Sequence, residues 1–263
     1  MTGRRNAVGD YLTQLLAVAD AEVAKLIHDP WDLVSRAVQP ILWLLLFGQV
    51  MAHVRGIAAG DGSYIDFLAP GVLAQSVLFV AIFYGLSAIW ERDLGVLHRY
   101  LVSPAPRSAL VLGKALASGA RGASQGLVIY ACSALMGVKL SLAPANMVGV
   151  IALILLASAL FSTFSLVIAC IVKTRERFMG VGQFLTMPIF FASNAIYPLA
   201  MMPDWLKAIA RANPLSYEVD ALRSLMLASG HSQFGVGTDF AVLVGCVGVL
   251  VIVATRMYPR LTE

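Results

Sequence analysis

A single serine of this sequence stands in a pattern that hydrolases use. Residues 122–126 read Gly-Ala-Ser-Gln-Gly, so Ser124 fits the GxSxG pattern of a nucleophile elbow. An elbow requires a strand–turn–helix and a nearby histidine, whereas Ser124 falls inside a long apolar stretch and no histidine stands in the middle of such a stretch. Helix packing explains the glycines better, since Gly122 and Gly126 form a GxxxG row that lets helix backbones approach closely. An intramembrane hydrolase that uses Ser124 stays open as a competing hypothesis.

The sequence carries no motif for binding a nucleotide or a metal ion. A phosphate-binding loop requires GxxxxGK[ST], but Gly113 and Lys114 are followed by Ala115, and Ser108 occupies the place of the first glycine. The zinc motif HExxH is also missing, and the three cysteines all fall in apolar segments. We therefore expect no enzyme activity, catalytic residue, cofactor or metal site in this chain.

Polar and aromatic side chains recur on one side of two apolar stretches, within residues 66–90 and 178–198. Facing helices of this composition suit an amphiphilic substrate, although hydrogen bonding and packing between helices account for most such residues in bundles. With one deep charge added, the candidate residues for a substrate path are Phe79, Phe83, Arg121, Gln183, Asn194 and Tyr197.

The deep charge is Arg121, which stands seven residues after Lys114 on the same helical face. Lys114 can reach the membrane surface, but Arg121 is about 10 Å deeper by helical rise. A charge at that depth is costly and usually faces water or the protein interior. The two hypotheses are a polar lining of a transport path and a structural pairing with Glu91 or Asp93.

These residues must be positioned by helices that cross a membrane. Mean hydropathy is +0.80, and only 13% of the residues are charged, against about 25% in a soluble domain. Six stretches reach the roughly 20 residues needed to span a bilayer. We expect an all-α, polytopic membrane protein in which residues 1–263 form one transmembrane domain. The predicted spans cover residues 34–54, 66–90, 110–136, 147–171, 178–198 and 239–257.

The distribution of positive charge predicts the orientation of the spans. Of the 19 Lys and Arg residues, 13 fall in the two termini and on one set of alternating loops, and cytoplasmic loops carry such an excess. Both termini are therefore predicted to be cytoplasmic. The same bias explains the pI near 9.1 without a nucleic-acid partner. Apolar residues at helical spacing in residues 1–30 predict an amphipathic helix on the membrane surface rather than a cleaved signal peptide.

Two connecting segments are long enough to hold structure of their own. The cytoplasmic segment, residues 91–108, has an apolar stripe among charges and suits either docking into a soluble partner or resting on lipid. The outer segment, residues 199–238, holds two amphipathic helical patterns. The first begins at Pro203 and Asp204, the pair Asn213-Pro214 ends it, and Ser216 is predicted to cap the second. These helices form either an outer cap or segments that dip into the outer leaflet.

At this point the residues resemble a known family, the type-2 ATP-binding-cassette (ABC) exporter permeases, and most closely its drug-exporter branch. Residues 66–71 read Asp-Phe-Leu-Ala-Pro-Gly and look like the start of that family's second span. Residues 91–104 look like its cytoplasmic coupling segment. The most specific match is Asn-Pro-Leu-Ser-Tyr-Glu-Val-Asp-Ala-Leu-Arg at residues 213–223, which follows Met-Pro-Asp-Trp-Leu at residues 202–206.

The resemblance implies a division of labour that fits the missing phosphate-binding loop. A separate ABC ATPase subunit would bind ATP and magnesium and push on the coupling segment and the N-terminal surface helix. Six spans per chain imply a half-transporter, which needs a second permease subunit, identical or paralogous. By motif position, the residues that the resemblance assigns to coupling are Glu91, Gly95, Leu97 and Pro104.

The implied function is export of a hydrophobic or amphiphilic compound, a drug, antibiotic or lipid, across a bacterial cytoplasmic membrane. Export of a polysaccharide or lipid-linked glycan is the alternative within the same class. The hypotheses from other classes are the intramembrane hydrolase and a membrane anchor for a peripheral enzyme. The sequence does not identify the cargo.

Overall fold

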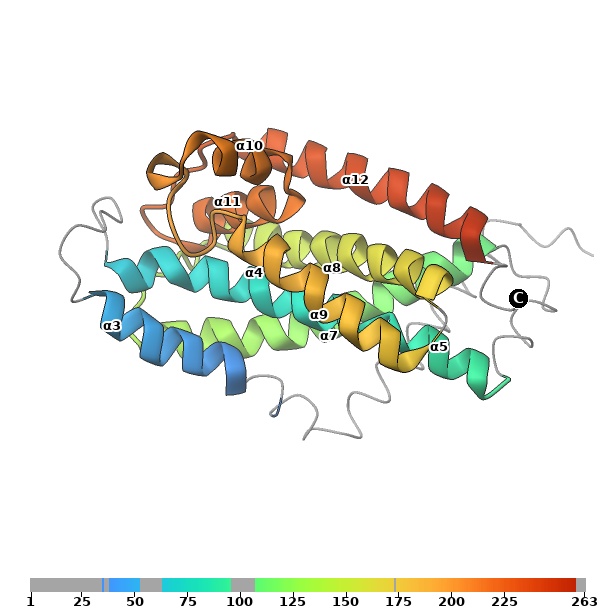
Figure 1. Cartoon of the computed structure of the whole chain (residues 1–263). Coiled ribbons are helices and arrows are strands. Elements are labelled where there is room, and N and C mark those ends of the chain that lie inside the picture. Colours follow the sequence, from blue (N-terminus) through green and yellow to red (C-terminus); the bar gives the residue numbers. More distant parts are fainter. Residues whose placement is uncertain (1–34, 36–37, 53–62, 96–106, 173, 259–263) are drawn as a thin grey trace, which may run out of the picture.

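Long helices that run along a common direction dominate the structure (Figure 1). The computed structural model describes residues 35, 38–52, 63–95, 107–172 and 174–258. Within them the bounds of the bundle helices are η1 (Trp43–Phe47), α3 (Gly48–Ala52), α4 (Tyr64–Tyr84), α5 (Leu86–Asp93), α7 (Arg107–Leu135), α8 (Pro144–Val172), α9 (Arg175–Phe191) and α12 (Val236–Met257). No strand occurs in this part of the chain, so the all-α prediction is confirmed for the residues that the structure describes.

Three of the described helices are long and apolar enough to cross a membrane: Tyr64–Asp93, Pro144–Val172 and Val236–Met257. The described helices at the other three predicted spans do not reach that length and apolar composition. Helix α7 has 29 residues but includes Lys114 and Arg121, and α9 has 17 residues because it ends at Phe191 rather than near residue 198. The count of six spans therefore stays a prediction.

Helix α8 is the central element, since it packs against α4, α7 and α12. Small residues allow a close approach between α7 and α8. A Cβ added at Gly119 would meet Leu155 at 2.8 Å, and one added at Gly126 would meet Ile154 at 2.7 Å. The GxxxG row predicted from the sequence, Gly122 and Gly126, thus lies in the seam between these two helices, as does Gly119.

A second group of helices covers one end of the bundle. It consists of η2 (Leu199–Met201), α10 (Asp204–Ala212) and α11 (Pro214–Met226), and we call residues 199–235 the cap. In Figure 1 the cap lies at the end where α4 begins, opposite the end that α5 reaches. The two helices predicted within residues 199–238 are present as α10 and α11, and their outer placement stays a prediction. The prediction that Ser216 is the N-terminal capping residue of the second helix is wrong. Asn213 accepts the hydrogen bond from Leu215 N, and Ser216 lies buried inside α11.

Candidate functional site

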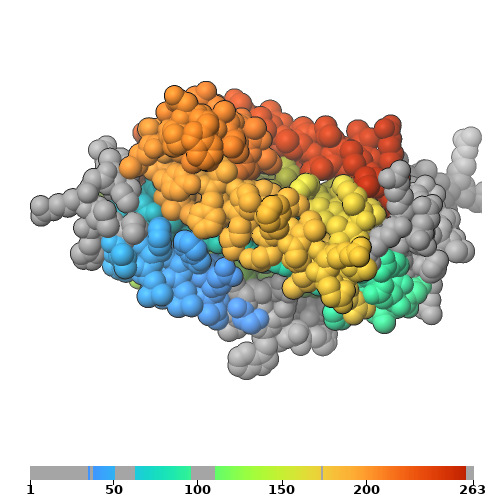
Figure 2. Space-filling view, viewed as in Figure 1, coloured from blue at the N-terminus to red at the C-terminus, as the bar shows by residue number. Residues whose placement is uncertain are grey.

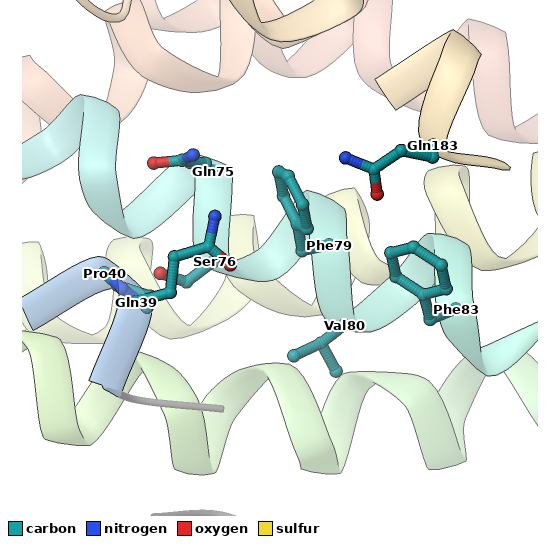
Figure 3. Close-up of a pocket in the computed structure, with 8 residues that line it drawn as sticks. All are labelled: Gln39, Pro40, Gln75, Ser76, Phe79, Val80, Phe83 and Gln183. Atoms are coloured by element: carbon teal, nitrogen blue, oxygen red, sulfur yellow. The ribbon is translucent and has the colours of Figure 1, made fainter. Parts of the chain in front are cut away.

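A groove runs along one side of α4 where polar and aromatic side chains meet. Its part nearer the cap has a volume of about 260 Å³ (Figure 3). Gln39 and Pro40 line it from the segment before η1, Gln183 from α9, and the remaining residues from α4. None of its lining residues carries a charge, so this part of the groove offers amide hydrogen bonds and aromatic faces. The lining residues contributed by α4 are Gln75, Ser76, Phe79, Val80 and Phe83.

The groove continues toward the tip of α5. A cavity of about 420 Å³ there shares Val80 and Phe83 with the first part, so the two are continuous along α4. Glu91 and Arg121 bring charge to this second part, and Trp90 adds an aromatic face. We call the two parts together the α4 groove. It changes from an uncharged, amide-rich section in the bundle to a charged section at the end of α5.

Gln75 is a groove residue that the sequence did not single out. Its side chain is only 3% exposed, and its Oε1 has no hydrogen-bond partner within the described residues (Figure 3). A buried amide oxygen without a partner is costly, and it is commonly satisfied by a ligand or a water molecule. The only available signal was a polar residue next to Ser76 on the predicted stripe.

The predicted path residues fall into two groups in space. Phe79, Phe83 and Gln183 line the α4 groove, and Arg121 lines its charged section, with its guanidinium 5.4 Å from the Tyr84 ring centroid. The other two predicted residues lie elsewhere, as described next. The predicted path residues of span 66–90 therefore all line one groove. Of those in span 178–198, Gln183 lines the groove and Asn194 and Tyr197 do not.

Asn194 and Tyr197 belong to the turn between α9 and the cap rather than to the groove. Asn194 is fully buried, and its main-chain carbonyl accepts a hydrogen bond from Arg223. The Tyr197 hydroxyl donates to the carbonyl of Phe191. The main chain of Asn194 and the side chain of Tyr197 connect chain segments here, because α9 ends at Phe191, before it reaches them. The side-chain amide of Asn194 has no hydrogen-bond partner within the described residues.

Ion pairs join the tip of α5 to Lys114 in α7 and to Arg175 at the start of α9. Lys114 lies 2.6 Å from Glu91, and Arg175 lies 2.9 Å from Asp93 and stacks at 4.6 Å over the ring of Trp90. We call Trp90, Glu91 and Asp93 with these two cations the α5 end. Glu91, one of the two acids predicted to pair with Arg121, is thus paired with Lys114.

Of the four residues assigned to coupling, the structure describes two. Glu91 is in the last turn of α5, and Gly95 follows that helix with φ of 72°, a left-handed conformation that favours glycine. Leu97 and Pro104 lie outside the described residues, as does the predicted N-terminal surface helix. Trp90 and Leu94 are 50% and 72% exposed, so the tip of α5 presents apolar surface beside its ion pairs.

Side chains of residues 213–223 fasten the cap to the bundle. The Asn213 side-chain amide donates to the carbonyls of Ile189 at 2.6 Å and Ala192 at 3.1 Å, while its oxygen caps α11. The Tyr217 hydroxyl donates to Arg211 O at 2.7 Å. Asn213 therefore ties α11 to the end of α9, and Tyr217 ties α11 to α10.

Buried charges complete the fastening of the cap. Arg223 donates to Asn194 O at 3.0 Å and lies 3.9 Å over the ring of Phe67 in α4. Burial lowers the pKa of Arg223 to about 10, with Asp220 acting in the opposite direction, so the side chain stays cationic at neutral pH. The Asp220 carboxylate accepts from the main-chain N–H groups of Gln233 at 2.7 Å and Phe234 at 3.0 Å.

Glu218 differs from these neighbours in α11. It is fully buried, and neither carboxylate oxygen has a hydrogen-bond partner within the described residues. Burial raises the pKa of Glu218 well above its ordinary value. A carboxyl group in such surroundings is held in its neutral form.

The structure also places the serine of the hydrolase hypothesis. Ser124 lies within α7, with no strand–turn–helix elbow around it, and its hydroxyl donates to Arg121 O at 2.8 Å. His231, the one histidine in the described residues, belongs to the cap. The local geometry that an elbow nucleophile requires is therefore not formed here.

Comparison with known proteins gives consistent matches over most of the chain. A family model described as ABC-2 type transporter matches residues 13–227. The daunorubicin resistance ABC transporter permease protein DrrB1 of Streptomyces coeruleorubidus is 28% identical over 240 residues, which is 88% of this chain and 81% of that protein. A Mycobacterium tuberculosis protein named "Probable doxorubicin resistance ABC transporter permease protein DrrC" is 26% identical over 235 residues, 86% of this chain and 82% of that protein. Nodulation protein J of Rhizobium leguminosarum is 28% identical over 202 residues, 76% of this chain and 75% of that protein.

Proposed function

Because the chain belongs to the ABC-2 type transporter family, we propose that it exports an amphiphilic compound out of the cytoplasm or inner leaflet, driven by ATP hydrolysis on a separate subunit. Permeases of this family are membrane transport subunits that work with an ABC ATPase subunit. The drug-resistance permeases among the relatives support a drug or antibiotic as the class of cargo. A polysaccharide or lipid-linked glycan is the alternative cargo.

The observation that carries this proposal is the α4 groove. Its uncharged section combines the amides of Gln75 and Gln183 with the rings of Phe79 and Phe83, a surface that suits a flat amphiphile bearing hydrogen-bonding groups (Figure 3). Its charged section ends at Trp90 and Glu91, where the resemblance places coupling to the ATPase. One continuous surface would therefore connect the cargo with the element on which the motor acts.

The arrangement of the two ends supports the predicted orientation. The cap and the α5 end lie at opposite ends of the bundle (Figure 1), as expected if one faces outward and the other faces the cytoplasm. The proposal includes six spans, cytoplasmic termini, a bacterial cytoplasmic membrane and a second permease subunit that completes the transport path.

The test is cargo-stimulated ATPase activity and efflux in vesicles that hold this chain together with the ATPase subunit that co-purifies with it. Daunorubicin is the first probe. Phe83→Ala, which alters both sections of the α4 groove, is expected to lower stimulation and efflux at least tenfold. Phe184→Ala is the matched control. Phe184 follows the groove residue Gln183 in α9, but its side chain is 74% exposed and lines no part of the groove.

Equal activity in the two variants would contradict the groove as the cargo path. A chain that co-purifies with no ATPase, in native membranes and in mild detergent, would contradict the transporter proposal and favour the anchor hypothesis. No efflux of daunorubicin by the parent protein, together with stimulation by a lipid-linked glycan that Phe83→Ala abolishes, would keep the path and change the cargo.

A further inference from the structure

A second groove, distinct from the α4 groove, lies between α8 and α12. Its volume is about 580 Å³, and Phe161 and Phe164 of α8, Ile189 of α9 and residues 242–250 of α12 form its walls. Pro214 lines it from the cap. In Figure 2, atoms of α8 are visible in the recess between α9 and α12, beside the cap. We call it the α12 groove; none of its lining residues is charged, and all are apolar apart from the thiol of Cys246 and the backbone of Gly245.

The α12 groove faces the hydrocarbon of the bilayer. Only 11% of the most apolar window of α12 is buried inside the protein. Val244, Val249 and Ile252 on that helix are 56%, 63% and 55% exposed, which is the pattern of a lipid-facing span. A recess in such a surface is filled by lipid rather than by water, because an apolar lining offers water no hydrogen bonds.

The length of the groove matches one leaflet. Residues 242–250 span eight helical steps, which is about 12 Å, and half of a bilayer core is about 15 Å. A helix of that length and about 10 Å in diameter occupies roughly 900 Å³, which exceeds the volume of the groove. The groove therefore suits a hydrocarbon tail better than a helix of a partner protein.

The cap indicates which leaflet is involved. Trp205 and Ile209, one turn apart on α10, are 66% and 48% exposed, and Met201 before them is 56% exposed. A short helix with an exposed aromatic and aliphatic face belongs at the headgroup level of a membrane. Pro214, close to that helix in the chain, lines the α12 groove, so a tail in the groove begins at the depth where headgroups of this leaflet lie.

We propose that the α12 groove binds an acyl tail of one phospholipid from the leaflet next to the cap. The site is independent of what the protein transports. The bound tail fills the space between α8, α9 and α12, and it is expected to stabilise the packing of the cap against the bundle.

Two glycines of α12 provide a matched test. A Cβ added at Gly245 or at Gly248 meets no atom within 4 Å, so both positions accept a larger side chain. Only Gly245 lines the groove. Gly245→Phe therefore fills the groove from within, whereas Gly248→Phe adds the same side chain to the open surface of the same helix.

The measurement is native mass spectrometry of the purified chain with its co-purifying subunits, titrated with palmitoyl-oleoyl phosphatidylglycerol. We expect one retained lipid per chain in the parent protein and in Gly248→Phe, and at least a tenfold weaker retention in Gly245→Phe. The lipid should also raise the melting temperature of the first two proteins but not of the third. Gly245→Val gives the same comparison with a smaller side chain if the phenylalanine variant does not fold.

Equal retention in the two phenylalanine variants would overturn the proposal, and so would a parent protein that retains no lipid. Loss of a complex between two chains, instead of a lipid, in Gly245→Phe would assign the groove to a second copy and also overturn it.

Discussion

The two ends of the bundle use their charges in different ways. In the cap, Arg223 and Asp220 are buried and bonded to main-chain groups, so their partners cannot rotate away. At the α5 end, Glu91 and Asp93 are bonded to side chains, and the paired groups are 10% to 41% exposed. The Asp93–Arg175 pair is the more exposed of the two, and pairs of that kind between flexible side chains contribute little to stability and separate easily. The comparison indicates a fixed cap and an α5 end that can rearrange.

Two glycines of the predicted second span show the same difference. A Cβ at Gly71, near the cap, would overlap the main-chain carbonyl of Ala195. A Cβ at Gly85, between α4 and α5, would overlap the side chain of Ser165, whose hydroxyl bonds to the carbonyl of Ile82. At Gly71 the added Cβ would have to displace the main chain of Ala195. At Gly85 it would mainly have to displace the side chain of Ser165.

The largest expected effect comes from these glycines. Gly71→Ala should lower the free energy of unfolding by about 3 kcal/mol, because overpacking against main chain forces a backbone shift. Gly85→Ala should cost about 2 kcal/mol, and Ser165→Gly in the same chain should restore part of the loss. Thermal unfolding in detergent measures both. Equal losses at the two positions, with no rescue by Ser165→Gly, would remove the distinction between the two ends.

The next effect tests the buried charge that holds the cap. Arg223→Met keeps the length of the side chain but removes the hydrogen bond to Asn194 O and the contact with the ring of Phe67. We expect a loss of about 2 kcal/mol, since hydrogen bonds to charged groups contribute about 1.5–3 kcal/mol. Protease cleavage within residues 199–235 should increase in parallel. A variant that melts like the parent would show that the cap does not depend on this residue.

The sequence allowed the helices to be predicted but not the partners of their polar residues. Hydrophobic periodicity placed the helices, and Asn213-Pro214 marked the boundary between α10 and α11 because proline fixes the start of a helix. Helical spacing predicts Asn194 and Tyr197 on the path only if the helix continues past residue 191, and α9 ends at Phe191. Periodicity carries no information once a helix has ended.

The sequence likewise marks Asp66 and Arg223 as motif residues but does not show which distant residues they contact. Asp66 caps α4 by accepting from Ser63 N at 3.1 Å, and it also accepts from Lys139 N at 3.2 Å, a contact across 73 residues. The local cap can be anticipated from sequence spacing, whereas the distant contact depends on how α7 and α8 are connected. Arg223 over Phe67 is a distant contact of the same kind.

A smaller effect concerns the buried carboxyl group that lacks a described partner. Burial raises the pKa of Glu218, so the folded chain keeps this proton to higher pH than the unfolded chain does. The resulting stability is complete below the ordinary value of 4.5 and is lost as the pH rises toward the raised pKa. Glu218→Gln should remove this decline and be more stable than the parent at neutral pH.

Melting temperatures between pH 5 and pH 8 test this expectation. Glu176→Gln is the control, because Glu176 is exposed at the start of α9 and should leave the slope unchanged. A parent slope equal to that of Glu218→Gln would contradict the raised pKa and mean that the fold compensates an ionised Glu218.

The smallest effect on stability, and the most informative for function, is expected at the α5 end. Lys114→Met breaks the 2.6 Å pair with Glu91 and should lower the free energy of unfolding by about 1 kcal/mol, the upper end for surface pairs, because this pair is part-buried. If the α5 end transmits force from the ATPase, the same change should reduce cargo-stimulated ATPase activity far more than it reduces stability. The exchanged pair Lys114→Glu with Glu91→Lys should recover coupling, because it restores the link between α5 and α7. The control is Arg211→Gln in the cap, which removes an exposed cation at the other end of the bundle. Coupling lost equally in Lys114→Met and Arg211→Gln would show that charge in general, rather than this connection, supports the coupled activity.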